Sequence, residues 1–205
     1  MLSWWLSEAK PDWQPVQVDV GGSGLASSLW EALQQGTMAD FTLLCDGARL
    51  PCHRLLLATR SEFFRGLLTT ELSEARTDVF TVTDVGVETL RLVLEFLYTD
   101  RLRDTADELG QEQVQLLMNA ADFYVVPGLK RLCEDWLIFG LDTTNMVDRL
   151  ILGDTYNAAN LRRVAKEMLL ENAKKLEQVP DWQAKLATRT QLVLEVFGDL
   201  AKSSM

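Results

Sequence analysis

The chain has 205 residues, 47% of them hydrophobic, and a formal net charge of -10 at pH 7. A chain of this length and composition can bury one large core or two modest ones, so we expect a folded protein. Its 20 basic residues are scattered among 30 acidic ones, which argues against a protein that binds the nucleic-acid backbone without specificity. We therefore expect its partners to be proteins.

No apolar run approaches the length that spans a bilayer, and the N-terminus lacks the basic region and sustained apolar stretch of a signal peptide. Three cysteines without C-x-x-C spacing are too few for a disulfide framework and suit a reducing compartment, the cytoplasm or the nucleus. A zinc site is not expected, because Cys52 and the single histidine, His53, leave a four-ligand set incomplete. We expect no metal, no cofactor and no membrane contact.

The N-terminal segment, residues 1–24, is expected to stand apart from the domain that follows. Residues 1–15 mix tryptophan with proline and predict irregular chain, whereas the alternating valines of residues 16–20 are typical of a short strand. The glycine-rich residues 21–24 are expected to end that strand.

A helix is predicted next, because leucine recurs at every fourth position as Leu25, Leu29 and Leu33. Gly36 is placed to cap its C-terminus. The default interpretation of such an apolar face is that it packs on the core of its own chain.

Residues 40–52 predict a β-hairpin. Phe41, Leu43 and Cys45 occupy alternate positions, and Asp46-Gly47 supplies the two-residue turn of a tight hairpin. The returning strand is expected to end at Pro51, because proline cannot donate a main-chain hydrogen bond.

Two short helices are predicted directly after the hairpin. From His53 the apolar period becomes helical, and Ser61 is placed to cap the second helix. That helix is expected to bury Phe63, Phe64 and the leucines that follow them.

The rest of the first domain is predicted to hold one more clear strand and three helices. Residues 79–82 alternate as a strand, residues 101–103 are a candidate edge strand, and Gly140 ends the domain. The three helices are indicated by apolar residues at i, i+3 and i+4 spacing and by a proline at a helix start: Leu90, Val93, Leu94 and Leu97; Val114, Leu117, Met118 and Ala121; Pro127, Leu129, Leu132, Cys133 and Trp136.

From Thr144 onward the sequence is helical in period and carries no strand signal. The expected organisation is therefore an N-terminal segment at residues 1–24, a mixed domain at residues 25–140 and a helical extension at residues 141–201. The short linker 141–143 is not rich in glycine, so we expect the extension to be attached rather than free.

The opening of the mixed domain carries a set of residues whose order and spacing match a known family: Asp40-Phe41, Asp46-Gly47, Cys52-His53-Arg54, Leu57-Ala58, Ser61 and Phe64. These residues resemble the opening of a BTB (POZ) domain. The resemblance continues to the end of the helical extension and is strongest to the speckle-type POZ group. It implies an α+β fold, a small sheet flanked by helices, followed by a short all-α BACK-like extension. The MATH domain of that group is not expected here, because residues 1–20 are too few for a β-sandwich.

The resemblance also implies a dimer. In BTB domains the N-terminal helix packs across a two-fold axis against the partner's first core helix, and two-fold homodimers are the commonest assembly. The expected interface residues are Leu25, Leu29, Leu33 and Leu56. Asp40 and Arg54 correspond to charges near the central groove of the dimer, where an ion pair is plausible.

Leu72-Ser73-Glu74 resembles the φ-x-E motif, a hydrophobic residue two before a glutamate, with which adaptors of this family contact cullin-3. Tyr124, on a later helix, is expected to contribute less. The function implied is a non-enzymatic, homodimeric adaptor that bridges cullin-3 and an unknown substrate for ubiquitin transfer. The alternative is a scaffold that self-assembles or recruits transcriptional partners without a ligase.

The sequence gives only weak support to two specific chemical functions, nucleotide binding and catalysis by a histidine. Gly22, Gly24 and Ser27, with Asp46 about twenty residues on, approach a dinucleotide fingerprint, but the hairpin at Asp46 leaves no crossover for a parallel sheet. His53 could act as a general base, yet no nucleophile motif accompanies it, so a capping or packing role is expected.

Overall fold

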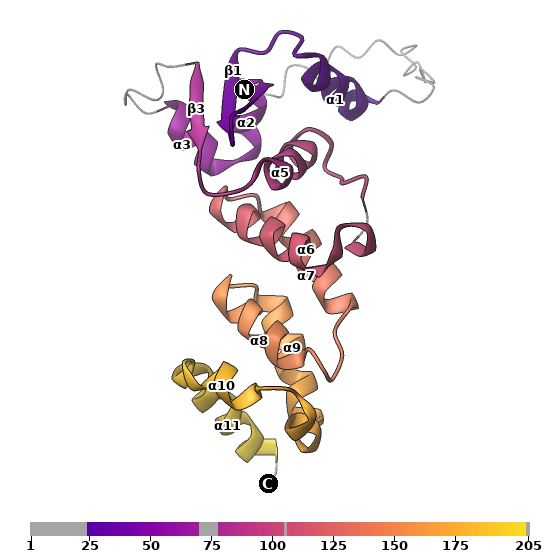
Figure 1. Cartoon of the computed structure of the whole chain (residues 1–205), viewed down its shortest axis with the longest axis vertical. Coiled ribbons are helices and arrows are strands. Elements are labelled where there is room, and N and C mark those ends of the chain that lie inside the picture. The colour runs from indigo at the N-terminus through magenta and orange to yellow at the C-terminus, as the bar shows by residue number, and fades with distance from the viewer. Residues whose placement is uncertain (1–23, 70–77, 105, 204–205) are drawn as a thin grey trace, which may run out of the picture.

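The structure is a computed structural model that describes residues 24–69, 78–104 and 106–203. The molecule is elongated, with a small sheet near one end and helices along the rest of its length (Figure 1). We call residues 25–140 the N-terminal unit and residues 141–203 the helical extension. The described elements are, in chain order, α1 (Leu25–Gln35), β1 (Phe41–Cys45), β2 (Ala48–Cys52), α2 (Arg54–Arg60), α3 (Glu62–Thr69), β3 (Val79–Val82), α5 (Val87–Thr99), α6 (Ala106–Phe123), α7 (Pro127–Phe139), α8 (Met146–Thr155), α9 (Ala159–Glu171), the 3₁₀ helix η1 (Ala173–Gln178), α10 (Trp182–Ala187) and α11 (Thr190–Ser203).

The described residues form one sheet of three strands in the order β2-β1-β3. β1 pairs antiparallel with β2 and parallel with β3. Helices α2 and α3 lie in the connection from β2 to β3. Asp46 and Gly47 turn the hairpin with φ angles of 50° and 78°, the left-handed conformation that a two-residue turn requires. The predicted hairpin is confirmed.

Pro51 lies inside β2 and does not end it, so this detail of the sequence prediction is wrong: the strand continues to Cys52. The reason is the register. Thr42, opposite Pro51, donates its N–H to Asp78 on the β3 side, so the main-chain groups of this pair point away from each other. The nitrogen of Pro51 faces the open edge of the sheet, where no ladder hydrogen bond is lost.

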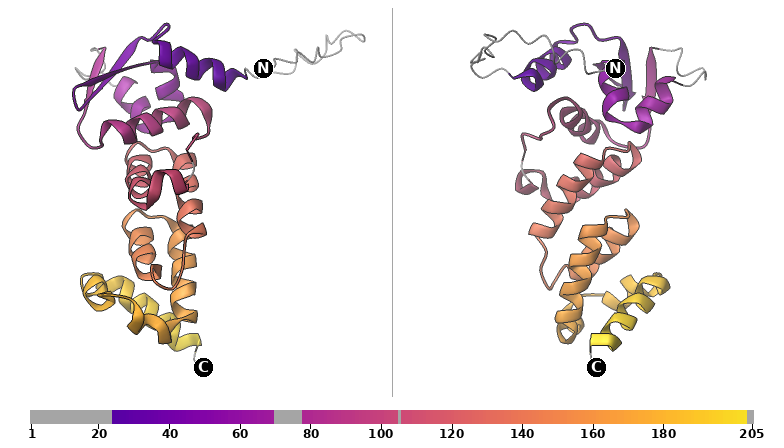
Figure 2. Two further views of the ribbon diagram at one scale, coloured as in Figure 1. Left: turned by 45° about the vertical axis from the view of Figure 1, so that its right-hand side comes forward. Right: turned by 180° about the vertical axis from the view of Figure 1, so that it is seen from behind.

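Helix α5 is the centre of the N-terminal unit. Residues 92–98 are all buried, which is the pattern of a helix enclosed on every side rather than on one face. α1, α2 and α6 pack against it, and Figure 2 shows α1 lying across it beside the sheet. The apolar stripe predicted from Leu90 to Leu97 is confirmed as core.

The candidate edge strand at residues 101–103 does not form. The main-chain N–H of Arg103 donates to the buried carboxylate of Glu95 at 3.2 Å, and its side-chain Nε donates to the same oxygen at 2.9 Å. Because these donors are used locally, the segment is held against α5 and has no sheet ladder to join.

The helical extension has a second core of its own. It still joins the first, because Ala158 and Leu161 at the start of α9 belong to the core of the N-terminal unit. Glu134 of α7 also accepts the main-chain N–H groups of Asn160 and Leu161, at 3.1 and 3.3 Å, and so caps α9 from the neighbouring domain. The buried residues of the second core are Met146, Val147, Leu150, Ala165, Leu169, Val179 and Leu192.

Candidate protein-interaction surfaces

The leucines expected at a dimer interface divide into two groups. Leu33 is buried in its own chain, and Leu29 and Leu56 are half-buried against the same core. Leu25, at the start of α1, is 77% exposed. Leu55, which the sequence analysis did not single out, is 73% exposed on α2. Each of these two helices therefore presents one large apolar side chain to solvent.

Asp40 and Arg54 are in contact, but not through a side-chain ion pair. The Asp40 carboxylate accepts the main-chain N–H of Arg54 at 2.8 Å and so helps to cap α2. The Arg54 guanidinium instead pairs with Asp78 at 3.1 Å and lies over the Phe41 ring at 4.6 Å. These contacts fix the hairpin, α2 and the start of β3 to one another.

The expected cullin-binding motif, Leu72-Ser73-Glu74, lies outside the described residues. In the chain it falls between α3, which ends at Thr69, and β3, which begins at Val79. A cluster of aromatic rings lies where α3 meets the end of α6. Phe64 stacks on Tyr124 with ring centroids 5.3 Å apart, and Phe63 packs edge-on against the same ring at 5.2 Å.

Tyr124 itself is 0% exposed, so it supports this region from beneath rather than at its surface. Burial raises the pKa of its phenol, and its hydroxyl has no hydrogen-bond partner. Its neighbours reach the surface instead: Phe123 is 43% exposed and Val125 is 42% exposed. Val125 has a φ of 52°, which is strained for a β-branched residue.

Ser61 explains how this cluster is held. Its hydroxyl accepts the N–H of Phe64 at 3.2 Å, so the predicted cap of α3 is confirmed. The same hydroxyl donates to the carbonyl of Tyr124 at 2.5 Å. One side chain therefore links the start of α3 to the turn after α6.

His53 has the structural role that the sequence predicted. Its Nε2 lies 2.8 Å from the carbonyl of Thr37, which can only accept, so Nε2 carries the proton. Its Nδ1 then accepts from the Tyr98 hydroxyl at 2.7 Å, and that hydroxyl accepts the His53 main-chain N–H at 3.0 Å. Both ring nitrogens therefore link the start of α2, one to the turn after α1 and the other to α5.

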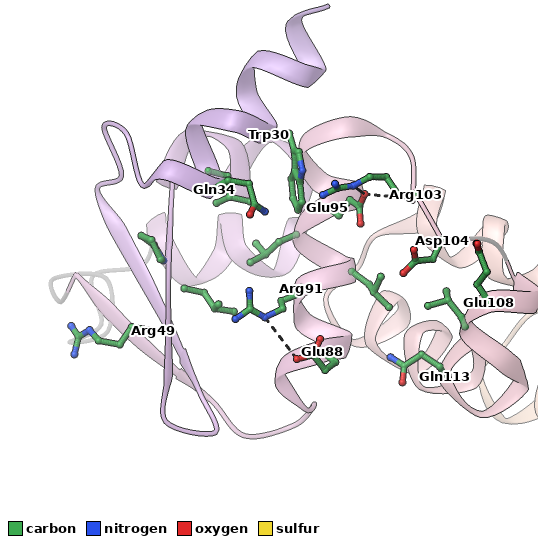
Figure 3. A pocket seen from close by; sticks show the side chains of 16 residues that line it. Trp30, Gln34, Arg49, Glu88, Arg91, Glu95, Arg103, Asp104, Glu108 and Gln113 are labelled. Atoms are coloured by element: carbon green, nitrogen blue, oxygen red, sulfur yellow. Dashed lines mark hydrogen bonds and ion pairs between the residues drawn. The ribbon is translucent and has the colours of Figure 1, made fainter. Parts of the chain in front are cut away.

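A cavity of about 620 Å³ lies between α1, β2, α5 and the start of α6 (Figure 3). Four of its charged side chains form two ion pairs. Arg103 meets Glu95 and lies 5.1 Å from the centre of the Trp30 ring, while Arg91 approaches Glu88 at 4.0 Å. Neither a histidine nor a cysteine is among its lining residues, and its acidic ones are Glu88, Glu95, Asp104 and Glu108.

The cysteines and acidic groups offer no metal site within the described residues: no cluster of three or more His, Cys, Asp or Glu is placed to hold an ion. Cys45, Cys52 and Cys133 are free and buried. Burial raises the pKa of Cys52 and Cys133 to about 12, so both remain protonated and unreactive. No described helix is both long and apolar enough to cross a membrane.

Comparison with known proteins gives relatives of three kinds. Protein maternal effect lethal 26 of Caenorhabditis elegans is 25% identical over 93% of this chain and 48% of its own length. TD and POZ domain-containing protein 3 of Mus musculus is 27% identical over 87% of this chain and 48% of its length. An Arabidopsis thaliana ARM repeat protein interacting with ABF2 is 29% identical over 77% of this chain and 21% of its length. The chain thus spans about half or less of these relatives.

Among solved structures, the BTB domain of zebrafish PATZ1 is 21% identical and matches 54% of this chain and 85% of its own, with a TM-score of 0.46. A family model for the BTB/POZ domain matches residues 29–141. That match covers more than half of the 205 residues. The chain therefore belongs to the BTB/POZ domain family, with the α+β fold of that domain followed by a helical extension, and it is a protein-interaction module.

Proposed function

We propose that this chain is a homodimeric, non-enzymatic adaptor that joins cullin-3 to a substrate protein for ubiquitin transfer. The observation that carries the homodimer is that Leu25 and Leu55 are largely exposed on α1 and α2 of a BTB domain, and the cullin-3 role rests on the resemblance of Leu72-Ser73-Glu74 to the φ-x-E motif. These are the two helices that BTB dimers pack against each other across the two-fold axis. Exposed large apolar groups at such positions are typical of a surface that a partner covers. Free, buried cysteines suit the reducing cytoplasm or nucleus.

The proposed cullin-3 contact is Leu72-Ser73-Glu74, with Tyr124 as its support. The motif connects α3 to β3, and α3 carries Phe63, which packs on the exposed Phe123 at 5.3 Å. An apolar anchor beside a charge is the usual composition of an interface hot spot. The buried Tyr124 ring packs on Phe63 and Phe64, so it joins α3 firmly to the turn after α6.

The proposal is tested by titration calorimetry of the cullin-3 N-terminal domain against the wild-type chain and a Leu72→Ala, Glu74→Ala variant. Truncating such residues costs about 1 to 3 kcal/mol, so we expect binding to weaken by roughly fivefold to over a hundredfold. A Glu177→Ala, Leu194→Ala variant is the matched control, because these side chains are exposed on the helical extension. Its affinity should equal that of the wild type.

Equal affinity for all three proteins would remove residues 72–74 from the contact. Absence of binding to the wild type would favour the second candidate function, a self-associating BTB scaffold without a ligase role. Exposed Leu25 and Leu55 support that function equally, because they indicate only that a second copy of the chain binds there. The dimer alone therefore does not separate the two functions, and the cullin titration does.

A further inference from the structure

Arg149, on α8, is a buried cation that lacks a partner. It is only 3% exposed, and its Nε has no hydrogen-bond partner. No ion pair reaches its guanidinium from any residue in the described part of the chain. Because arginine stays charged at any ordinary pH, it cannot relieve this burial by losing a proton. Buried charges in proteins are normally paired with an acid or hydrogen-bonded in full.

The side chain lies in the wall between two cavities at the joint of α6, α7 and α8. The cavity between α6 and α8 has a volume of about 380 Å³. Besides Arg149, its polar lining consists of one acid, Asp148, and of neutral groups, among them Gln111, Gln115 and Asn145. A smaller cavity of about 90 Å³ lies at the end of α7, where Phe139 is almost fully exposed. Arg149 and Gln111 line both.

The acids around Arg149 are already engaged. Asp142 accepts the N–H groups of Thr144 and Asn145 at 2.7 and 3.1 Å, and Asp148 pairs with Lys185 at 2.8 Å. Both lie near enough to favour the charged guanidinium, although burial still lowers the pKa of Arg149. Their charges reduce the cost of burying Arg149 but leave its Nε–H without an acceptor.

We propose that the cavity between α6 and α8 is a binding site for a carboxylate, held by the Arg149 guanidinium. A guanidinium and a carboxylate form two parallel hydrogen bonds, and neutral amides such as Gln111 and Gln115 can donate to the remaining oxygen lone pairs. A singly charged group fits better than a phosphate, because only one cation is present and the chain carries a net charge of -10. Neither the proposed dimer face nor the cullin motif includes these residues.

Thermal unfolding of the full chain tests the site and separates the two sources of the carboxylate. The probes are sodium acetate against sodium chloride at equal ionic strength, and acetyl-Ala-Leu with a free C-terminal carboxylate against its amide. At about ten times the dissociation constant, the bound probe should raise the Tm by roughly 3 to 6 °C. A response to acetate indicates a site for free small carboxylates, and a response to the acid peptide alone indicates a peptide terminus. No response to either overturns the proposal.

Three variants locate the response. Arg149→Met should abolish it, and the Nε–H resonance of Arg149 should shift on titration of the wild type. Gln111→Glu places a carboxylate beside Arg149, so it should raise the Tm without any probe and remove the response. Gln191→Glu, the same charge change on the exposed face of α11, is the control and should do neither. A Gln111→Glu protein that keeps the full probe response would contradict the site, even if Arg149→Met failed to fold.

Discussion

In the N-terminal unit, α5 is surrounded by apolar side chains, whereas in the helical extension α11 rests on α9 largely through charged ones. Among the residues of α11 with described side chains, Leu192 is the one that is buried. Lys166 of α9 reaches both Glu195 and Asp199 of α11, at 2.9 and 2.8 Å, and Arg162 pairs with Glu195 as well.

The N-terminal unit also has ion pairs, some within one helix, such as Arg65–Glu62, and some between elements, such as Arg54–Asp78. The packing of α5, however, rests on its buried apolar residues. Charge screening by salt and changes of pH affect apolar packing less than they affect partly exposed ion pairs. The stabilities of α5 and α11 should therefore respond differently to the same change in solution.

The largest effect is expected on association, and it should be confined to the N-terminal unit. Replacing Leu25 and Leu55 by aspartate would bury two carboxylates in an apolar contact, which costs several kcal/mol, on the order of the whole association free energy of a modest dimer. We expect a folded monomer by light scattering. Leu194→Asp, on the exposed side of α11, should leave the dimer intact. A wild-type chain that is monomeric at tens of micromolar, a rough working range for such an interface, would contradict the dimer.

A smaller effect is expected on the unfolding free energy when the close contact between α8 and α9 in the helical extension is disturbed. A Cβ on Gly153 would lie 2.6 Å from the main-chain nitrogen of Arg162, so Gly153→Ala must force α8 and α9 apart. We expect a loss of about 3 kcal/mol in unfolding free energy, measured by urea denaturation. Gly198→Ala is the matched control in open space on α11, and it should be neutral or stabilising by up to about 1 kcal/mol. Equal stability of the two variants would mean that the helices are not in close contact.

The smallest expected effect is the dependence of the stability of α11 on pH. The hydrogen bond from Lys166 and the charge of Arg162 hold the pKa of Glu195 below its ordinary 4.5, so the stability it contributes is lost as pH falls below that range. Bonds to Asp199 and Glu195 raise the pKa of Lys166 above its ordinary 10.5, so its contribution is lost as pH rises beyond it.

Hydrogen exchange should show α11 best protected between these limits and less protected in high salt. The exchange of α5, corrected for the intrinsic pH dependence, should not change in the same way. If the exchange of α5 and α11 changed in the same way with pH and salt, the molecule would unfold as one unit. The two helices would then not differ in what stabilises them.

Local patterns in the sequence were sufficient for most of the N-terminal unit. The Asp46-Gly47 turn, the Ser61 cap and the stripe on α5 depend on chemistry within a few residues, and each is confirmed. The predictions for Pro51 and residues 101–103 were wrong because the secondary structure at both places depends on distant partners. Pro51 stays in its strand because Thr42, opposite it, directs its N–H toward β3, and residues 101–103 form no strand because Arg103 donates to the carboxylate of Glu95.

The interaction surfaces were less predictable. Periodicity marks Leu25, Leu29 and Leu33 as one face, but it cannot say that Leu33 turns inward while Leu25 remains exposed. Arg149 carries no sequence signal at all, because a charged residue on a helix is normally read as a solvated one. The proximity of Leu55 to Leu56 and Leu57 was a usable signal, since three consecutive leucines cannot all face the core on a helix that packs through one side only.

The most direct test of the account is the composition of the complex with the cullin-3 N-terminal domain, measured by light scattering after size-exclusion chromatography. A homodimeric adaptor should elute with two copies of this chain and two of the cullin domain. The Leu25→Asp, Leu55→Asp variant should give one copy of each, because its docking residues are unchanged. Co-elution of one wild-type chain with one cullin domain would contradict the dimer, and separate elution would contradict the adaptor itself.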